Sequence, residues 1–143
     1  MLIPHVVQTE PEKVFVNFLN VQASTVQAGD AVAWDSGTAD GVRATQPVTA
    51  TLSLFLGIVD ADVPASSYGL AQVYGYRGVG ALITNDTSVS VLAGDILIPV
   101  TATDRLARSA ASDGKTGFVF AGEAYNTNTT PVAALKKVFI RAL

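Results

Sequence analysis

Short runs rich in Val, Ile, Leu, Phe and Tyr recur along the chain, separated by clusters of Gly, Asp, Asn, Ser and Thr. Apolar residues at helical spacing are hard to find, whereas β-branched and aromatic runs between turn-forming residues are typical of strands. The pattern therefore predicts an all-β chain. We expect strands at residues 13–19, 31–34, 41–44, 55–59, 70–75, 80–83, 96–100, 106–109, 117–121 and 137–143.

The last of these strands has a helical alternative. The sequence Ala-Ala-Leu-Lys-Lys at 133–137 favours helix, so a single helix over 132–143 is the main competing interpretation. The run Val138-Phe139-Ile140 that follows is rich in β-forming residues. We therefore expect a strand at the C-terminal end of this sequence.

Two Ala-Gly-Asp triplets, at 28–30 and 93–95, indicate an internal repeat. In each triplet Gly can supply the positive φ of a tight turn, and Asp can hydrogen-bond nearby backbone before the next strand. Gly29 and Gly94 are 65 positions apart, and the same offset, applied without a gap, pairs further identical residues. The sequence thus predicts two similar β units, about 26–78 and 91–143, across a shared core. The further pairs are Val26 with Val91, Arg43 with Arg108, Phe55 with Phe120, Gly57 with Gly122, Leu70 with Leu135, and Val73 with Val138.

The chain's 143 residues are enough for one domain with a sizeable core. Residues 1–22 mix Pro4 and Pro11 with apolar residues, which suits an extended arm that lies on a partner. An edge strand of the same domain is the equally weighted alternative. We expect an arm at 1–22 and one domain at 23–143, built as a small β-barrel or β-tulip-like fold.

The composition limits the possible functions. There is no Cys, and 9 Lys and Arg residues against 12 Asp and Glu residues give a formal charge of −3, so we expect no nucleic-acid partner. Hydrophobic residues make up 49% of the chain and charged residues only 15%, so the surplus apolar surface predicts a subunit interface. We expect no membrane span and no signal peptide, and therefore synthesis in the cytoplasm.

Reactive side chains are few. His5 is the only histidine and lies in the expected arm, which argues against histidine-based catalysis. Asp60 and Asp62 could bind a cation or share acid–base work, but a solvated turn is the favoured interpretation. The glycine-rich stretch 75–80 precedes a strand and not a helix, so a bent hairpin or bulge is favoured over a phosphate loop. We expect no enzyme activity, no cofactor and no metal.

Interface residues can be named from the same pattern. Trp34 is expected to plug the core or an interface, Arg43 and Arg108 could form intersubunit salt bridges, and exposed tyrosines are typical of an interface rim. A sugar-stacking platform of Tyr68, Tyr74, Tyr76 and Tyr125, with Trp34, is the alternative for the aromatic residues. The predicted interface residues are His5, Val6, Val7, Trp34, Arg43, Tyr74, Tyr76 and Arg108.

Several of these segments together resemble a known family. They are Ala-Gly-Asp before an apolar strand, a Gly-Val-Arg-Ala strand, Leu56-Gly57-Ile58-Val59, the alternating stretch 71–75 and the closing Val138-Phe139-Ile140-Arg141. Over roughly 26–143 the chain is similar to the small β-rich decoration, or cement, proteins of tailed bacteriophage capsids. The long N-terminal segment and the Asn/Thr-rich stretch before Pro131 depart from that family.

The resemblance implies a protein without catalytic residues that attaches to the outside of the expanded head. It would bridge neighbouring major capsid subunits, often around threefold axes, and associate with itself as a homotrimer or another homo-oligomer. Two alternatives stay open. One is another virion component, such as a tail-tube, head-closure or fibre-associated subunit, and the other is a carbohydrate-binding module.

Overall fold

The computed structural model describes residues 12–38, 40–83, 90–109, 118–125 and 134–142. In this part of the chain every regular element is a strand except one 3-10 helix, so the all-β prediction is confirmed. The elements are β1 (Val14–Asn20), β2 (Ala31–Trp34), β3 (Arg43–Thr45), η1 (Thr49–Leu54), β4 (Phe55–Val59), β5 (Tyr68–Ile83), β6 (Ile96–Pro99), β7 (Leu106–Arg108), β8 (Val119–Ala121) and β9 (Ala134–Arg141).

The first five strands close a barrel. Strand pairing runs from β1 through β3, β2 and β4 to β5, and β5 returns to β1 through an antiparallel ladder from Val14 to Leu19. β1 also pairs in parallel with β3. Because β1 is hydrogen-bonded on both sides, residues 14–20 are neither part of an arm nor an edge strand. Residues 1–11 lie outside the described part of the chain.

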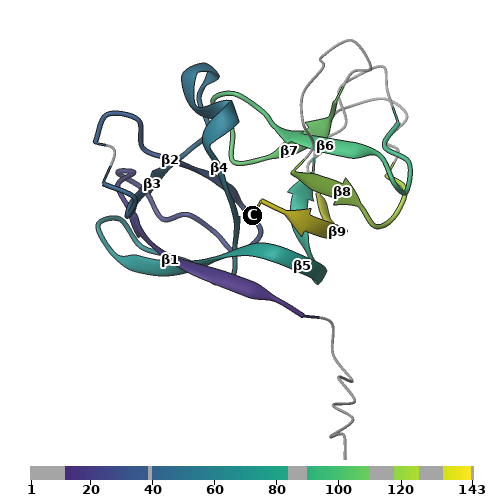
Figure 1. Cartoon of the computed structure of the whole chain (residues 1–143), viewed down its shortest axis with the longest axis horizontal. Coiled ribbons are helices and arrows are strands. Elements are labelled where there is room, and N and C mark those ends of the chain that lie inside the picture. Colours follow the sequence, from purple (N-terminus) through teal and green to yellow (C-terminus); the bar gives the residue numbers. More distant parts are fainter. Residues whose placement is uncertain (1–11, 39, 84–89, 110–117, 126–133, 143) are drawn as a thin grey trace, which may run out of the picture.

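The remaining strands form a second closed circuit that shares β5. Pairing runs from β5 through β7, β6 and β8 to β9, which returns to β5 along a long antiparallel ladder. A single residue pair, Ile83 with Leu106, joins β5 to β7. Figure 1 shows β1–β4 gathered on one side and β6–β8 on the other, with β5 extending between them. The described strands therefore form two circuits with the same pairing order, and β5 belongs to both. The first circuit includes β1, which lies outside the predicted first unit of 26–78.

The two Ala-Gly-Asp turns are structurally equivalent. Gly29 and Gly94 have φ values of 95° and 88°, and each Asp side chain caps its own turn. The Gln27 N–H donates to the Asp30 carboxylate at 2.7 Å, and the Leu92 N–H donates to the Asp95 carboxylate at 2.8 Å. Residues 65 positions apart are therefore structurally equivalent in these turns and in the strands that follow them, β2 and β6.

Beyond β2 and β6 the ungapped repeat is wrong. Ala31 pairs with Ile58, whereas its equivalent Ile96 pairs with Phe120, so the offset between β4 and β8 is 62. Ile58 pairs with Gln72, and Phe120 pairs with Phe139, so the offset between β5 and β9 is 67. The connections between strands differ in length, and turns tolerate such changes while the pairing pattern stays the same.

The hydrophobic core is divided into two clusters, one of which is shared between the two units. The first core is formed by Phe18, Val26, Val32, Ala44, Leu56, Val59, Val63, Ala71 and Val73. The second contains Val91, Leu97, Leu106, Val119, Ala121, Tyr125, Val138 and Ile140, together with Ala31, Phe55 and Ile58 from the first unit. All five residues of β4 are buried because this strand lies between the two cores.

β5 and β9 complete the comparison with the predicted elements. The expected strands 70–75 and 80–83 are one 16-residue strand, β5, with a register shift after Arg77. The glycine-rich stretch 75–80 is therefore a bulged part of a strand that continues to Ile83. β9 is a strand from Ala134 to Arg141, which confirms the strand interpretation over the helical one.

Candidate interaction surfaces

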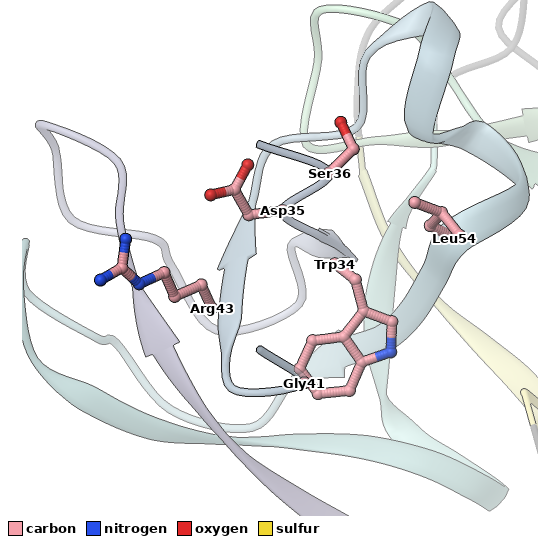
Figure 2. Close-up of a pocket in the computed structure, with 6 residues that line it drawn as sticks. All are labelled: Trp34, Asp35, Ser36, Gly41, Arg43 and Leu54. Carbon is pink, nitrogen blue, oxygen red and sulfur yellow. The ribbon is translucent and has the colours of Figure 1, made fainter. Parts of the chain in front are cut away.

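The first candidate surface is an open hollow beside β2 and β3. It encloses about 400 Å³ and is lined by Trp34, Asp35, Ser36, Gly41, Arg43 and Leu54. Trp34 ends β2, Arg43 begins β3 and Leu54 ends η1. Figure 2 shows the indole of Trp34 beside Gly41, with Leu54 to one side, whereas the guanidinium group of Arg43 points away from the indole. We call this site the hollow.

The β2–β3 connection, residues 35–42, gives the hollow its charge. The Nε of Arg43 lies 3.1 Å from a carboxylate oxygen of Asp40. The same carboxylate accepts the backbone N–H groups of Val42 and Arg43, at 2.9 and 3.0 Å, and these bonds lower the pKa of Asp40. Asp35 accepts the N–H of Gly37 at 2.9 Å. With two carboxylates and one guanidinium group, this rim of the hollow is slightly acidic.

The second candidate surface is a row of outward-facing side chains on the second unit. Register places Ile96 opposite Phe120, Phe120 opposite Phe139, and Phe139 opposite Tyr76, so one apolar line crosses β6, β8, β9 and β5. Ile96, Phe139 and Tyr76 are 39%, 38% and 37% exposed, and Phe120 is half-buried. The ring of Tyr74 packs edge-on against Phe139 with 5.7 Å between centroids. We call the side chains of Ile96, Phe120, Phe139 and Tyr76 the outward row.

The structure brings the predicted interface residues together in pairs. Trp34 and Arg43 line the hollow, and Tyr74 and Tyr76 lie at one end of the outward row. The guanidinium group of Arg108 is 2.9 Å from the Asp95 carboxylate of its own chain. Both arginines proposed for intersubunit salt bridges therefore already have an internal carboxylate neighbour. His5, Val6 and Val7 lie outside the described residues.

The sequence interpretation missed Ile96, Phe120 and Phe139. A signal was present in β9, where Val138 and Ile140 are buried while Leu135 and Phe139 are exposed. A strand with apolar residues on both faces has one face for its own core and another for a partner. Tyr125, by contrast, is buried in the second core, so the four tyrosines do not form one sugar-stacking platform.

Asp60 and Asp62 each hold a backbone or side-chain partner. The Arg77 guanidinium group, which is almost fully buried, donates to Asp60 at 3.0 Å and to the Val59 carbonyl at 3.0 Å. Asp62 accepts the Ala28 N–H at 2.9 Å. Within the described residues no three His, Cys, Asp or Glu side chains gather in a group able to hold a metal ion.

Acidic groups also lie where the two units meet. Desolvation by burial raises the pKa of Asp30 to about 6, and the nearby Asp104 carboxylate adds to this effect. Burial also raises the pKa of Asp104, whose carboxylate accepts a hydrogen bond from Gln46 of the first unit at 3.2 Å. Its backbone carbonyl accepts the Ala31 N–H at 2.8 Å.

No helix among the described elements has the length and hydropathy to cross a membrane.

Comparison with known proteins identifies a structural neighbour and no sequence relative. No protein-family model matches the chain, and no curated protein matches its sequence. The fold is similar to the crystal structure of the head fiber gp8.5 N base in bacteriophage phi29, with a TM-score of 0.52. The match covers 92% of this chain and 96% of that one at 14% sequence identity. At this identity the likeness establishes a shared fold.

Proposed function

We propose that this chain is a structural protein of a bacteriophage virion that attaches to the outside of the head. The fold that it shares with a phage head fiber base, over nearly the full length of both chains, carries this proposal. The resemblance of its sequence to capsid decoration proteins supports the same location. Its partners would be the major capsid protein and further copies of itself as a homotrimer, without an enzymatic role.

The two candidate surfaces supply a physical mechanism. A protein with separate apolar surfaces on its two units can contact two neighbours at once and so bridge them. Each contact is modest, but linking two binding surfaces on one rigid body makes the second contact intramolecular and raises the overall affinity. A shell carries many copies, so the added buried area stabilises it at many junctions.

Co-sedimentation tests attachment to the head. Purified protein is mixed with expanded heads of the encoding phage that lack it, and the heads are pelleted. We expect the chain to pellet with the heads in saturable amounts, and not with heads that already carry it. A chain that stays in the supernatant with undecorated heads would contradict the proposal.

The neighbour's description as a fiber base favours a second candidate, in which this chain is the foot of a head fiber. Immunogold labelling of intact particles separates the two. Label at the bases of discrete fibers favours the foot, whereas label spread over the head surface favours a decoration protein. Label along the tail would contradict both.

A further inference from the structure

The outward row has a direct topological counterpart in the first unit, where three of the four residues are covered. Ala31 pairs with Ile58, Ile58 with Gln72, and Gln72 with Phe15, across β2, β4, β5 and β1. This is the pairing order of Ile96, Phe120, Phe139 and Tyr76 in the second unit. Ala31 and Ile58 are 0% exposed and Gln72 is 1% exposed, whereas Ile96 and Phe139 are more than one-third exposed. At the β1 end of the first unit's row Phe15 is 38% exposed, as its counterpart Tyr76 is at 37%.

The second unit provides the cover for the first unit's row. Ala31 and Ile58 belong to the second core cluster, and the Phe55 ring lies 5.8 Å from that of Phe118. The β6–β7 connection, residues 100–105, adds polar contacts. The Ala102 N–H donates to the Pro47 carbonyl at 2.8 Å, and the Thr49 and Thr101 hydroxyl groups are 3.0 Å apart. The Asp104 carbonyl of the same connection accepts the Ala31 N–H at 2.8 Å, so the second unit's loop also contacts one residue of the first unit's row.

The first unit carries the equivalent of that loop, and it lines the hollow. Trp34 at the end of β2 pairs with Ala44 of β3, and Pro99 at the end of β6 pairs with Leu106 of β7. Trp34 and Pro99 are therefore equivalent positions in the two units. The connection at 35–42 therefore corresponds to the one at 100–105. It contributes Asp35, Ser36 and Gly41 to the lining of the hollow, beside Leu54 of η1, which is 38% exposed. The second unit's outward row and the first unit's connection at 35–42 are therefore the two parts that would contact each other if a further unit were added, and both are exposed on a single chain.

We propose that the outward row of one copy docks into the hollow of a second copy, repeating between chains the contact that the two units make within one. Charge is complementary, since Arg141 and Lys137 flank Phe139 on the exposed face of β9 and Asp35 and Asp40 lie in the β2–β3 connection. Such a contact is heterologous, and it closes into a ring when its rotation permits. A ring of three would be the homotrimer proposed above.

This inference deepens the proposed self-association, but it rests on the geometry of the two units. It can therefore fail independently of attachment to the head. A chain that pellets with heads and is monomeric in solution at all concentrations would overturn only the docking of copies described here.

Sedimentation velocity over a range of protein concentrations tests the docking. Phe139→Asp places a charge in the outward row, and Leu54→Asp places one in the hollow. We expect the wild-type chain to associate and each variant to sediment as a monomer. A mixture of the two variants should form a dimer and nothing larger, because one intact row remains for one intact hollow.

Matched variants separate docking from misfolding. Leu92→Asp changes a 54% exposed residue outside both surfaces and should associate as the wild type does. Ile96→Asp changes the row on another strand and should behave as Phe139→Asp does. Far-ultraviolet circular dichroism verifies that each variant is folded. A monomeric wild-type chain, undiminished association of the row variants, or a mixture that stays monomeric would each overturn the proposal.

Discussion

Asp30 and Asp95 show how one turn can have two electrostatic environments. Both cap an Ala-Gly-Asp turn through the same backbone hydrogen bond. Asp95 lies beside the Arg108 guanidinium group, whereas Asp30 is only 7% exposed and close to the Asp104 carboxylate. The hydrogen bond within the turn explains why Asp occurs at both positions. The surrounding residues determine how much free energy is needed to keep each carboxylate charged.

The raised pKa of Asp30 predicts a stability that falls as the pH rises. With a folded pKa of about 6 and an ordinary value of 3.8, the folded chain binds a proton more readily than the unfolded chain. The free energy of unfolding therefore decreases between about pH 4 and 6, by about 3 kcal/mol for a shift of this size. Asp104 acts in the same direction. Urea unfolding at pH 5 and pH 7 measures the difference.

Asp30→Asn keeps an oxygen acceptor for the Gln27 N–H and removes the buried charge. We expect this variant to be more stable than the wild type at pH 7, by about 1–2 kcal/mol, and to lose most of the slope between pH 4 and 6. Asp95→Asn is the control, since it alters the same turn position beside Arg108 and should be neutral or destabilising. A wild-type chain that gains stability from pH 5 to pH 7 would contradict the assignment.

At the scale of elements, β5 holds the two units together. It pairs with β1 and β4 in the first unit and with β7 and β9 in the second. Gly75 lies where these two parts of the strand meet, with φ of +101°, and a side chain there would collide with the backbone oxygen of Glu12. Only glycine satisfies both the conformation and the close approach.

Gly75→Ala should destabilise the chain by about 2–4 kcal/mol, because it adds a steric collision to an unfavourable φ. Gly41→Ala is the matched control. Gly41 also has positive φ, at +71°, but nothing lies within 4 Å of the place that a Cβ atom would take. Its cost should be only about 1 kcal/mol. Equal urea midpoints for the two variants would contradict the predicted collision.

Unequal strand pairing predicts unequal local stability. The β1–β5 ladder contains six residue pairs, whereas β5 and β7 share the single pair Ile83 with Leu106. Hydrogen exchange follows local opening, which is easier where few backbone bonds hold an element. We expect the amides of β7 to exchange well before those of Val16 and Phe18 in native-state exchange. Protection of β7 equal to that of β1 would show that the second circuit is closed more firmly than its pairing indicates.

At the scale of the whole molecule, we expect the two cores to behave as one folding unit. Ile58 and Phe55 of the first unit lie in the second core, and β5 belongs to both circuits. Fully burying an apolar side chain of this size stabilises the fold by about 1.5–3 kcal/mol, so neither unit can unfold without exposing part of the other. The chain should therefore unfold in one transition.

The single tryptophan provides a probe for this prediction. Trp34 lies in the first unit, so its fluorescence reports on that unit, whereas far-ultraviolet circular dichroism reports on all strands. Urea transitions followed by the two signals should coincide, with one midpoint. Two separate midpoints would show that the units unfold independently.

The sequence by itself determined the strands, the two turns and the presence of a repeat. These features depend on local chemistry: alternating apolar residues, β-rich runs, and glycine with aspartate at a positive-φ turn. The positions of β2 and β4 and the assignment of β9 as a strand were predictable for this reason. Trp34, Tyr74 and Tyr76 were predicted as interface residues because large aromatic side chains stand out in a chain with few charges, and that role stays a prediction.

Only the tertiary structure decided the register, the division of the core into two clusters and the surface residues that matter. The offset changes from 65 to 62 and then to 67 because insertions in turns leave strand pairing intact, and composition carries no record of pairing. Ile58 and Phe120 occupy equivalent positions, yet one is covered and the other half-exposed. Burial is set by which unit packs over a strand, and that contact is made by residues distant in sequence.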